Sequence, residues 1–261
     1  MSELIDVSLK GPTAEVALNR PGAYNAFNYE LVSQLADHLT ALAGDESVRG
    51  LVLTGRGKAF CAGGDLKWAL SHSNGPAAAF HTLASQFHRA VLEIRRMKKP
   101  VIAAINGVAA GGGFSLALAC DFRVMDPSAV LNQAYTSAGL CIDGGGTFTL
   151  PRLVGYARAF EIAAFDKPIS SVQALDWGLV TQVAPHGQAL SEAMSMAQDL
   201  AHKSVNSFAW TKKLMTDSFN TSFETQLEIE RAALEACADH PDGQEGLTAF
   251  AEKRKAKFVK K

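Results

Sequence analysis

The sequence is poor in cysteine, and its cysteines form neither a disulfide framework nor a zinc site. No C-x-x-C motif and no Cys/His ligand pair occurs. The four cysteines are widely spaced: Cys61, Cys120, Cys141 and Cys237. We therefore expect a protein of a reducing compartment without structural zinc.

An excess of one charge is also lacking, and the first residues do not have the pattern of a signal peptide. The formal net charge is −1 with 20% charged residues, so no global field favours nucleic acid or a membrane surface as a partner. The first twenty residues alternate like a strand and have neither the basic nor the apolar segment of a signal peptide. We expect a cytoplasmic protein of one large domain, or a domain with an extension, that binds neither nucleic acid nor membranes.

The most apolar part of the chain, residues 101–121 (VIAAINGVAAGGGFSLALACD), is too interrupted to cross a membrane. Asn106 and three consecutive glycines would break a spanning helix. Their order instead predicts a buried strand at Val101–Ile105, a tight turn, and a helix at residues 114–120. Glycines at a helix start let a ligand approach backbone N–H groups that lack partners inside the helix, so this turn is suited to an anion or oxyanion.

Two other interpretations of this stretch stay open on its residues alone. Residues 113–117 (GFSLA) differ from the G-x-S-x-G nucleophile elbow only at the last position. A glycine cluster that serves packing alone fits the pattern equally well. A second glycine loop would favour a ligand site over both.

Such a loop occurs at residues 58–66 (KAFCAGGDL), directly after a predicted strand, where open α/β sheets present ligand-binding backbone.

Residues 67–75 are expected to form a loop and residues 135–146 an irregular segment, and Thr221 and Glu224 have the spacing of a capping box. His81 and His88 are expected on a helix surface. Periodicity predicts strands at 4–9, 13–18, 48–54, 122–125 and 179–184. It predicts helices at 28–43 and 76–96, further helices between the irregular segment and about residue 176, and helices after residue 188.

Three motifs in this order resemble the enoyl-CoA hydratase/isomerase (crotonase) superfamily, and the likeness covers essentially the whole chain. They are residues 19–21 with 25–27 (NRP, NAF), 59–66 (AFCAGGDL), and 105–107 with 111–113 (ING, GGG). Residues 145–152 and 174–180 add further matches. P-loop and dinucleotide-binding signatures are absent.

The resemblance implies how a thioester would be held. In that family two backbone N–H groups grip the thioester oxygen of an acyl-CoA, and they correspond here to Gly64 and Gly112. Such donors would stabilise the negative charge that develops on this oxygen when an enolate forms. The likeness implies no metal and no redox cofactor, because the CoA thioester is the substrate. It places the CoA moiety along Ala26, Ala62, Asp65 and Leu66.

The acidic side chains distinguish members of the family. Hydratases use two glutamates, and the corresponding positions here are Ser115 and Tyr135. Neither replaces a carboxylate readily near neutral pH, so hydration is not favoured. Asp143 lies where the resemblance places the catalytic aspartate of some isomerases and of aromatic acyl-CoA dehalogenases, and its setting is most similar to bacterial isomerases of the phenylacetate-degradation type. On its residues alone, Asp before Gly is more typical of a turn.

We therefore predict an enoyl-CoA isomerase in which Asp143 removes an α-proton from a 3-enoyl-CoA and returns it at the γ-carbon. Leu140 and Ile142 are expected to desolvate this carboxylate and make it a stronger base. Ser115 is predicted to line the substrate pocket, and Tyr135 either to line it or to form a hydrogen bond with the substrate. The companion aromatic and histidine residues of a dehalogenase are not evident in the sequence.

Three alternatives remain open. The nearest is hydration of a 2-enoyl-CoA to a 3-hydroxyacyl-CoA. A serine thioesterase would need Ser115 activated by His186, His202 or His240. The third is a protein that binds acyl-CoA without turnover.

The resemblance also implies the architecture. It is an α/β fold of the crotonase type, a spiral of stacked ββα units followed by a helical C-terminal oligomerisation region. We predict that the core, with acyl-CoA binding and catalysis, spans residues 1–200 and that the helical trimerisation region spans 201–261. Family members commonly trimerise through such helices, so a homotrimer or a hexamer (a dimer of trimers) is expected.

Overall fold

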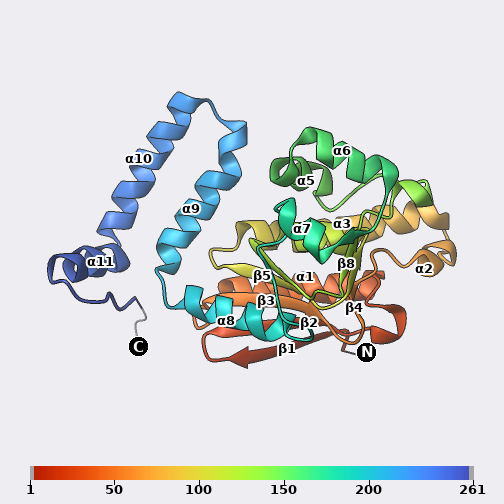
Figure 1. The fold of residues 1–261 in the computed structure, drawn as a ribbon, viewed down its shortest axis with the longest axis horizontal. Helices are drawn as coiled ribbons and strands as arrows, with labels where there is room; N and C mark the ends of the chain where they lie inside the picture. Colours follow the sequence, from red (N-terminus) through yellow and green to blue (C-terminus); the bar gives the residue numbers. More distant parts are fainter. Residues whose placement is uncertain (1–2, 259–261) are drawn as a thin grey trace.

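Two β-sheets and the helices packed on them form the main body of the molecule (Figure 1). This computed structural model describes residues 3–258. The first sheet has the order β1 (Ile5–Lys10), β2 (Thr13–Leu18), β3 (Gly50–Gly55), β5 (Val101–Ile105), β7 (Phe122–Met125) and β10 (Gln182–Val183). The second has the order β4 (Ala59–Cys61), β6 (Val108–Ala110), β8 (Val130–Asn132) and β9 (Ile169–Ser170).

Each turn of the chain adds one strand to each sheet and then a helix. β3 and β4 precede α2 (Leu66–Leu70) and α3 (Gly75–Arg96), β5 and β6 precede α4 (Gly112–Ala119), and β7 and β8 precede α5 (Gly146–Val154) and α6 (Tyr156–Phe165). Strands of successive turns pair in parallel within each sheet. The predicted spiral of stacked ββα units is therefore confirmed, and it places the turns after β4 and β6 side by side.

Alternate residues of the central strands face two apolar layers. In β3, Leu51 and Leu53 join the larger core with α1 (Tyr29–Gly44) and α3, whereas Val52 joins the layer under α8 (Ala189–Ala201). Both faces of the parallel part of the sheet are covered in this way. This explains why its strands read as continuous apolar runs rather than as alternating patterns.

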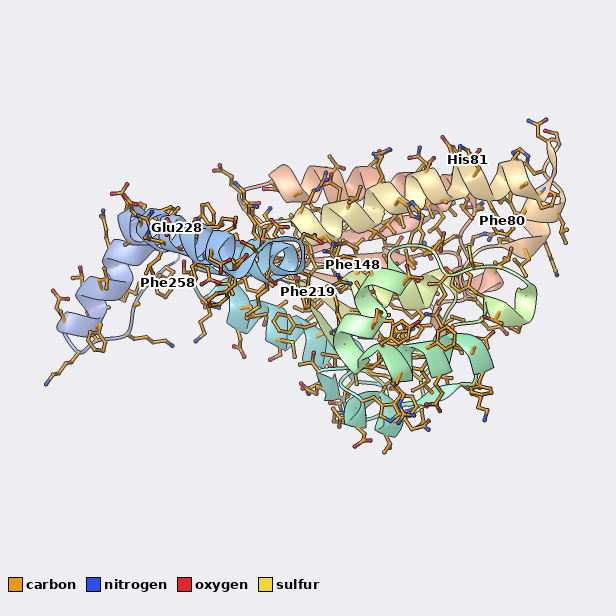
Figure 2. The ribbon with its side chains drawn as sticks, turned by 90° about the horizontal axis from the view of Figure 1, so that it is seen from above. Phe80, His81, Phe148, Phe219, Glu228 and Phe258 are labelled. Carbon is orange, nitrogen blue, oxygen red and sulfur yellow. The ribbon has the colours of Figure 1, made fainter. Side chains whose placement is uncertain are left out.

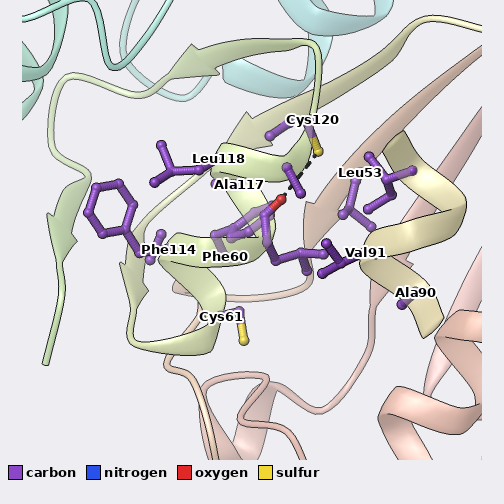
Figure 3. Packing of buried hydrophobic residues seen from close by; sticks show 14 of the residues in the cluster. Leu53, Phe60, Cys61, Ala90, Val91, Phe114, Ala117, Leu118 and Cys120 are labelled. Atoms are coloured by element: carbon purple, nitrogen blue, oxygen red, sulfur yellow. Dashed lines mark hydrogen bonds between the residues drawn. The ribbon is translucent and has the colours of Figure 1, made fainter. Parts of the chain in front are cut away.

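The central helix α4 is buried along its whole length. It carries no charged side chain, and it begins with glycine directly after β6. Figure 3 shows α4 inside the core, with Leu53 of β3 and Ala90 and Val91 of α3 on one side and its own Phe114 and Leu118 pointing to the other. A helix enclosed in this way holds its first turn in a fixed position.

The helices α9 (Val205–Asp217), α10 (Phe223–Asp239) and α11 (Pro241–Ala251) lie beside the main body (Figure 1). Lys212 Nζ of α9 lies 2.8 Å from Asp121 Oδ2, and this buried ion pair ties the two parts together. Burial raises the pKa of Asp121, and the Lys212 charge opposes this shift. The role of residues 201–261 in oligomerisation stays a prediction, and residues 259–261 of that range lie outside the described part.

Two elements differ from the sequence-based expectation because of local hydrogen bonds. Residues 66–70, expected as a loop, form α2, since Asp65 Oδ1 accepts from the Trp68 N–H at 3.0 Å and caps the helix. The last strand is only Gln182–Val183, because the Leu179 N–H donates to the end of α7 (Ser171–Asp176) instead of to the sheet. No helix within residues 3–258 is long and apolar enough to span a membrane.

The predicted capping box at Thr221 is wrong by one residue. Ser222 is the N-cap of α10, with its Oγ accepting from the Thr225 N–H at 3.2 Å. Thr221 instead bonds Gln226 through its hydroxyl at 3.0 Å. Two adjacent hydroxyl residues suit the cap and both have extended backbone; α10 begins at Phe223, so Ser222 is the residue that directly precedes it and takes the cap.

Candidate active site

The turn after β4 is held by backbone hydrogen bonds on both sides of Gly64. Phe27 forms a parallel bridge with Gly64: the Phe27 N–H donates to the Gly63 carbonyl at 2.7 Å, and the Asp65 N–H donates to the Phe27 carbonyl at 2.8 Å. These bonds engage the residues on both sides of Gly64. Within residues 3–258, the Gly64 N–H itself donates to no carbonyl, so it is free to bind a ligand.

Cys61 holds the same turn from the buried side. Its thiol donates to the Asn25 carbonyl at 3.1 Å, and its Sγ accepts from the Gly63 N–H at 3.4 Å. Burial raises the pKa of the Cys61 thiol to about 12. The thiol therefore stays protonated at neutral pH and keeps its donor role, so Cys61 positions the glycine turn.

The second amide lies at the start of α4. The Gly111 N–H donates to the Asn132 carbonyl at 3.0 Å, and the Ser115 N–H donates back to the Gly111 carbonyl at 3.1 Å. The Gly112 N–H belongs to the first helical turn, whose donors have no partner inside the helix. In the described part of the chain it donates to no other group.

Gly63 brings the two turns into contact. A Cβ at this position would lie 2.8 Å from the Ala110 carbonyl oxygen and 3.1 Å from the Gly112 nitrogen, and φ is +88°. Only glycine fits such a close approach without displacement. Gly64 and Gly112 consequently line one cavity, as expected for a pair of oxyanion donors, a role that stays a prediction.

A mostly apolar cavity of about 580 Å³ lies in front of these amides. Phe27 and Phe87 pack against each other in its wall, with ring centroids 4.9 Å apart. Further apolar residues of the wall are Ala62, Leu66, Phe80, Leu83, Ala84 and Leu140. Figure 2 shows Phe80 and His81 on the part of α3 that covers it. Such a lining suits an acyl chain.

Asp143 lies in the wall of the same cavity and has a partner near each oxygen. The Tyr135 hydroxyl donates to Oδ1, and His88 Nε2 lies 3.9 Å from Oδ2. Burial and the neighbouring Asp143 charge raise the pKa of Tyr135 well above its usual value. Tyr135 therefore keeps its proton and acts as a donor. The side chain of Asp143 is 34% exposed, so the expected desolvation by Leu140 and Ile142 is incomplete until the cavity is filled.

Ser115 does not form part of the cavity wall, contrary to expectation. It is fully buried behind the glycines that follow Asp143: a Cβ at Gly146 would lie 2.7 Å from Ser115 Oγ. Its Oγ, although close to the Tyr135 hydroxyl, makes no hydrogen bond of normal geometry within residues 3–258. No histidine bonds it there, so the structure offers Ser115 no activating base.

The residues expected beside the CoA moiety divide into two groups. Ala62 and Leu66 line the cavity. Ala26 and Asp65 are joined by Arg20, whose Nη1 donates to the Ala26 carbonyl at 3.0 Å and to Asp65 Oδ2 at 2.7 Å. Burial by itself would raise the pKa of Asp65, but its hydrogen bonds from the Trp68 N–H and Arg20 lower it. The Asp65 carboxylate thus serves the loop, and its contact with CoA stays a prediction.

His88 is the residue at the site that the sequence did not reveal. Its side chain is 50% exposed on α3, as expected for a surface position, yet Nε2 also accepts from the Gly144 N–H at 3.3 Å. The only signal in the sequence is that His88 follows Phe87, a residue of the cavity wall. The packing of the 143–146 turn on α3 is a tertiary contact that periodicity does not encode.

Metal binding finds no support in the described residues. Within residues 3–258, no group of three or more His, Cys, Asp or Glu side chains is placed to hold a metal ion. The expectation that no metal or redox cofactor takes part stays a prediction.

Comparisons with known proteins give one family and several reactions. The family model described as enoyl-CoA hydratase/isomerase matches residues 10–261. The chain is 35% identical over 262 residues to 1,2-epoxyphenylacetyl-CoA isomerase of Escherichia coli (strain K12), covering 100% of both chains. It is 32% identical over 253 residues to 4-chlorobenzoyl coenzyme A dehalogenase-2 of Arthrobacter sp, covering 95% of this chain and 91% of the relative. The crystal structure of an enoyl-CoA hydratase from Polaromonas sp. JS666 matches with a TM-score of 0.92 and 36% identity, covering 97% and 98%.

Proposed function

Since the chain belongs to the enoyl-CoA hydratase/isomerase (crotonase) superfamily, we propose that it is an isomerase that moves the double bond of a 3-enoyl-CoA to the 2-position. One observation carries this proposal. Among the described residues of the cavity wall, Asp143 is the sole carboxylate, and the wall also contains Gly64 and Gly112. A double-bond shift needs one base that can also return a proton.

The proposed reaction uses these three residues in sequence. Asp143 removes the α-proton, and the electrons of the C–H bond form an enolate whose oxygen is held by the Gly64 and Gly112 N–H groups. The enolate then collapses, the double bond moves into conjugation, and Asp143 returns the proton at the γ-carbon. Removing one such oxyanion donor typically costs about 10²–10³ in kcat. Tyr135 holds Oδ1 of the base, which leaves Oδ2 to carry the proton.

Hydration is disfavoured by what surrounds the cavity. Addition of water needs an acid and a base placed around one water molecule. Ser115 is buried outside the wall, and Tyr135 keeps its proton because its pKa is raised by burial and by Asp143. A single carboxylate supports proton transfer between carbons more readily than addition of water.

A second candidate function is favoured by His88. Asp143 next to a histidine could attack a ring carbon of a halogenated aromatic acyl-CoA, so that halide leaves with its electron pair and an aryl ester forms on Asp143. Water activated by His88 would then hydrolyse that ester. The 3.9 Å between His88 Nε2 and Asp143 Oδ2 and the dehalogenase relative support this candidate.

The decisive experiment is NMR of a 3-enoyl-CoA, a 2-enoyl-CoA and a 4-halobenzoyl-CoA, each incubated separately with the protein. We expect only the first to react, with migration of its double bond. Asp143→Asn should lower turnover by roughly 10²–10⁴-fold while acyl-CoA binding is retained. Asp176→Asn, a change to an exposed carboxylate of α7, is the control. Undiminished turnover in Asp143→Asn would refute the assignment, 3-hydroxyacyl-CoA would establish hydration, and released halide would establish the second candidate.

Oligomeric state and location complete the proposal. Exposed apolar side chains on α10 and α11 support association through the C-terminal helices: Phe223, Leu227, Leu234, Leu247 and Phe250. A second copy of the chain would bury them, so we propose a homotrimer or a dimer of trimers, located in the cytoplasm. Light scattering on the full chain tests the assembly, and a monomer at micromolar concentration would refute it.

A further inference from the structure

We infer that His88 and a second cavity behind it allow Asp143 to exchange its proton with solvent during the isomerisation. This inference rests on the proposed function. It concerns the fate of the transferred proton, which the double-bond shift by itself does not determine.

The second cavity begins where the acyl cavity ends. It has a volume of about 400 Å³, and His88 and Gly144 belong to its wall, whereas Asp143 belongs to the wall of the acyl cavity. The boundary between the two cavities is therefore the pair of Asp143 and His88, whose Oδ2 and Nε2 atoms are 3.9 Å apart. A proton on Asp143 has the substrate on one side and His88 on the other.

The wall of the second cavity is mixed, with apolar Val91 and Leu92 beside several polar side chains that can bind water. Arg95, Thr149 and Asn220 offer hydrogen-bond partners there, together with the apolar Phe148. Ordered water needs a space of this kind with two or more polar partners. Figure 2 shows Phe148 near Phe219, where α5 meets the C-terminal helices, so the cavity lies at the junction of the two parts of the molecule.

The hydrogen bond to His88 fixes which ring nitrogen can accept a proton. Nε2 accepts from the Gly144 N–H at 3.3 Å, so in the neutral ring the hydrogen is on Nδ1. Nε2 is also the nitrogen that faces Asp143 Oδ2. The single lone pair of Nε2 is thus engaged by the Gly144 N–H and must be released before this nitrogen can take a proton from the acid, while Nδ1 keeps its proton.

The relay is balanced without another reactant. After Asp143 has taken the α-proton, Oδ2–H passes it to His88 Nε2, and the Nδ1 proton of the resulting imidazolium passes to water. The 3.9 Å gap exceeds a hydrogen bond, so the transfer needs a rotation of the half-exposed ring that breaks the bond from the Gly144 N–H and turns the Nε2 lone pair toward Oδ2, directly or through one bridging water. The reverse steps return a solvent proton to Asp143 and then to the γ-carbon. His88 acts through Asp143 and does not touch the substrate.

Isomerisation in deuterated water tests the relay, because the double-bond shift and deuterium at the γ-carbon are counted separately by NMR. The full-length protein should place deuterium at the γ-carbon in most turnovers. His88→Gln keeps an oxygen that can accept from the Gly144 N–H but cannot pass a proton on. We expect its deuterium content per turnover to fall by roughly tenfold, with the isomerisation rate far less affected. His38→Gln on α1 is the control and should match the wild type.

A second variant covers the case in which His88→Gln does not fold. Thr149→Leu leaves His88 in place but fills the second cavity with an apolar side chain, so deuterium per turnover should fall there too. Migration without deuterium in the wild type, or unchanged deuterium in either variant, would overturn the relay and leave the isomerase proposal intact. Loss of isomerisation in His88→Gln as severe as in Asp143→Asn would overturn it as well. If the wild type does not shift the double bond at all, the proposed isomerase function is refuted, and the relay is refuted with it.

Discussion

Replacing Gly63 by alanine tests whether the contact between the two glycine turns supports catalysis. The substitution leaves the Gly64 and Gly112 amides in the sequence but alters the contact that places them side by side. The added Cβ would lie 2.8 Å from the Ala110 carbonyl oxygen and 3.1 Å from the Gly112 nitrogen. Both neighbours are backbone atoms of the turn before α4, so one of the two turns must move.

The size of the effect follows from two terms. With φ at +88°, an L-residue at Gly63 adopts a rarely populated conformation, which costs on the order of 1–3 kcal/mol of stability. Displacement of one oxyanion donor lowers kcat by about 10²–10³, which corresponds to about 2.7–4 kcal/mol of transition-state stabilisation. We therefore expect a folded, moderately destabilised protein that has lost most of its turnover.

Gly57→Ala provides the matched control. Gly57 also has a positive φ, +77°, and a Cβ there would lie 2.9 Å from Pro21 Cβ, but it does not line the acyl cavity. Thermal unfolding, kcat with a 3-enoyl-CoA and the Kd of a saturated acyl-CoA should be measured for both variants. We expect Tm to fall by similar amounts in Gly63→Ala and Gly57→Ala, and kcat to fall only in Gly63→Ala. Wild-type kcat in a destabilised Gly63→Ala would refute the proposed pairing of the two amides.

Three further predictions concern single side chains. Tyr135→Phe removes a hydrogen bond to the Asp143 carboxylate worth about 1.5–3 kcal/mol, so kcat should fall by roughly ten- to a hundredfold in steady-state assays with KM little changed; an unaltered kcat would contradict the positioning role. Lys212→Met leaves Asp121 buried without its partner, and urea denaturation should show a loss of about 3–5 kcal/mol, partly recovered by adding Asp121→Asn. Asp65→Ala removes the side-chain cap of α2 and should cost about 0.5–2 kcal/mol at pH 7. Because the pKa of Asp65 is lowered in the fold, its contribution is complete above the unfolded value of about 3.9 and is lost as pH falls through the lower folded value. A difference in stability that persists unchanged at lower pH would contradict this.

The sequence predicts best where one local rule acts without competition. The apolar run of β5 and the glycines that follow it identify a strand and a helix start, because no other structure accommodates both. Errors arise where two local solutions are nearly equal. Thr221 and Ser222 both suit a cap, and α2, with five residues, is too short to show a helical period.

The candidate site is only partly predictable from sequence for the same reason. Gly64, Gly112 and Asp143 each belong to a motif, and the structure brings all three to one cavity. The position of His88 beside Asp143 depends on the packing of a distant turn against α3, and no local pattern records it. Ser115 matches a motif position as well, yet the close approach of the turn after Asp143 places it behind the cavity.

The division of the site between main-chain and side-chain groups has a consequence for directed evolution. The proposed thioester donors are peptide groups held by Cys61 and by the contact at Gly63, whereas the groups near the reacting carbons are side chains from the 135–143 segment and α3. A library that randomises His88, Tyr135 and Asp143 together leaves the grip on the thioester in place. Selection on such a library would sample new reactions of acyl-CoA enolates within a scaffold that continues to bind the same class of substrate.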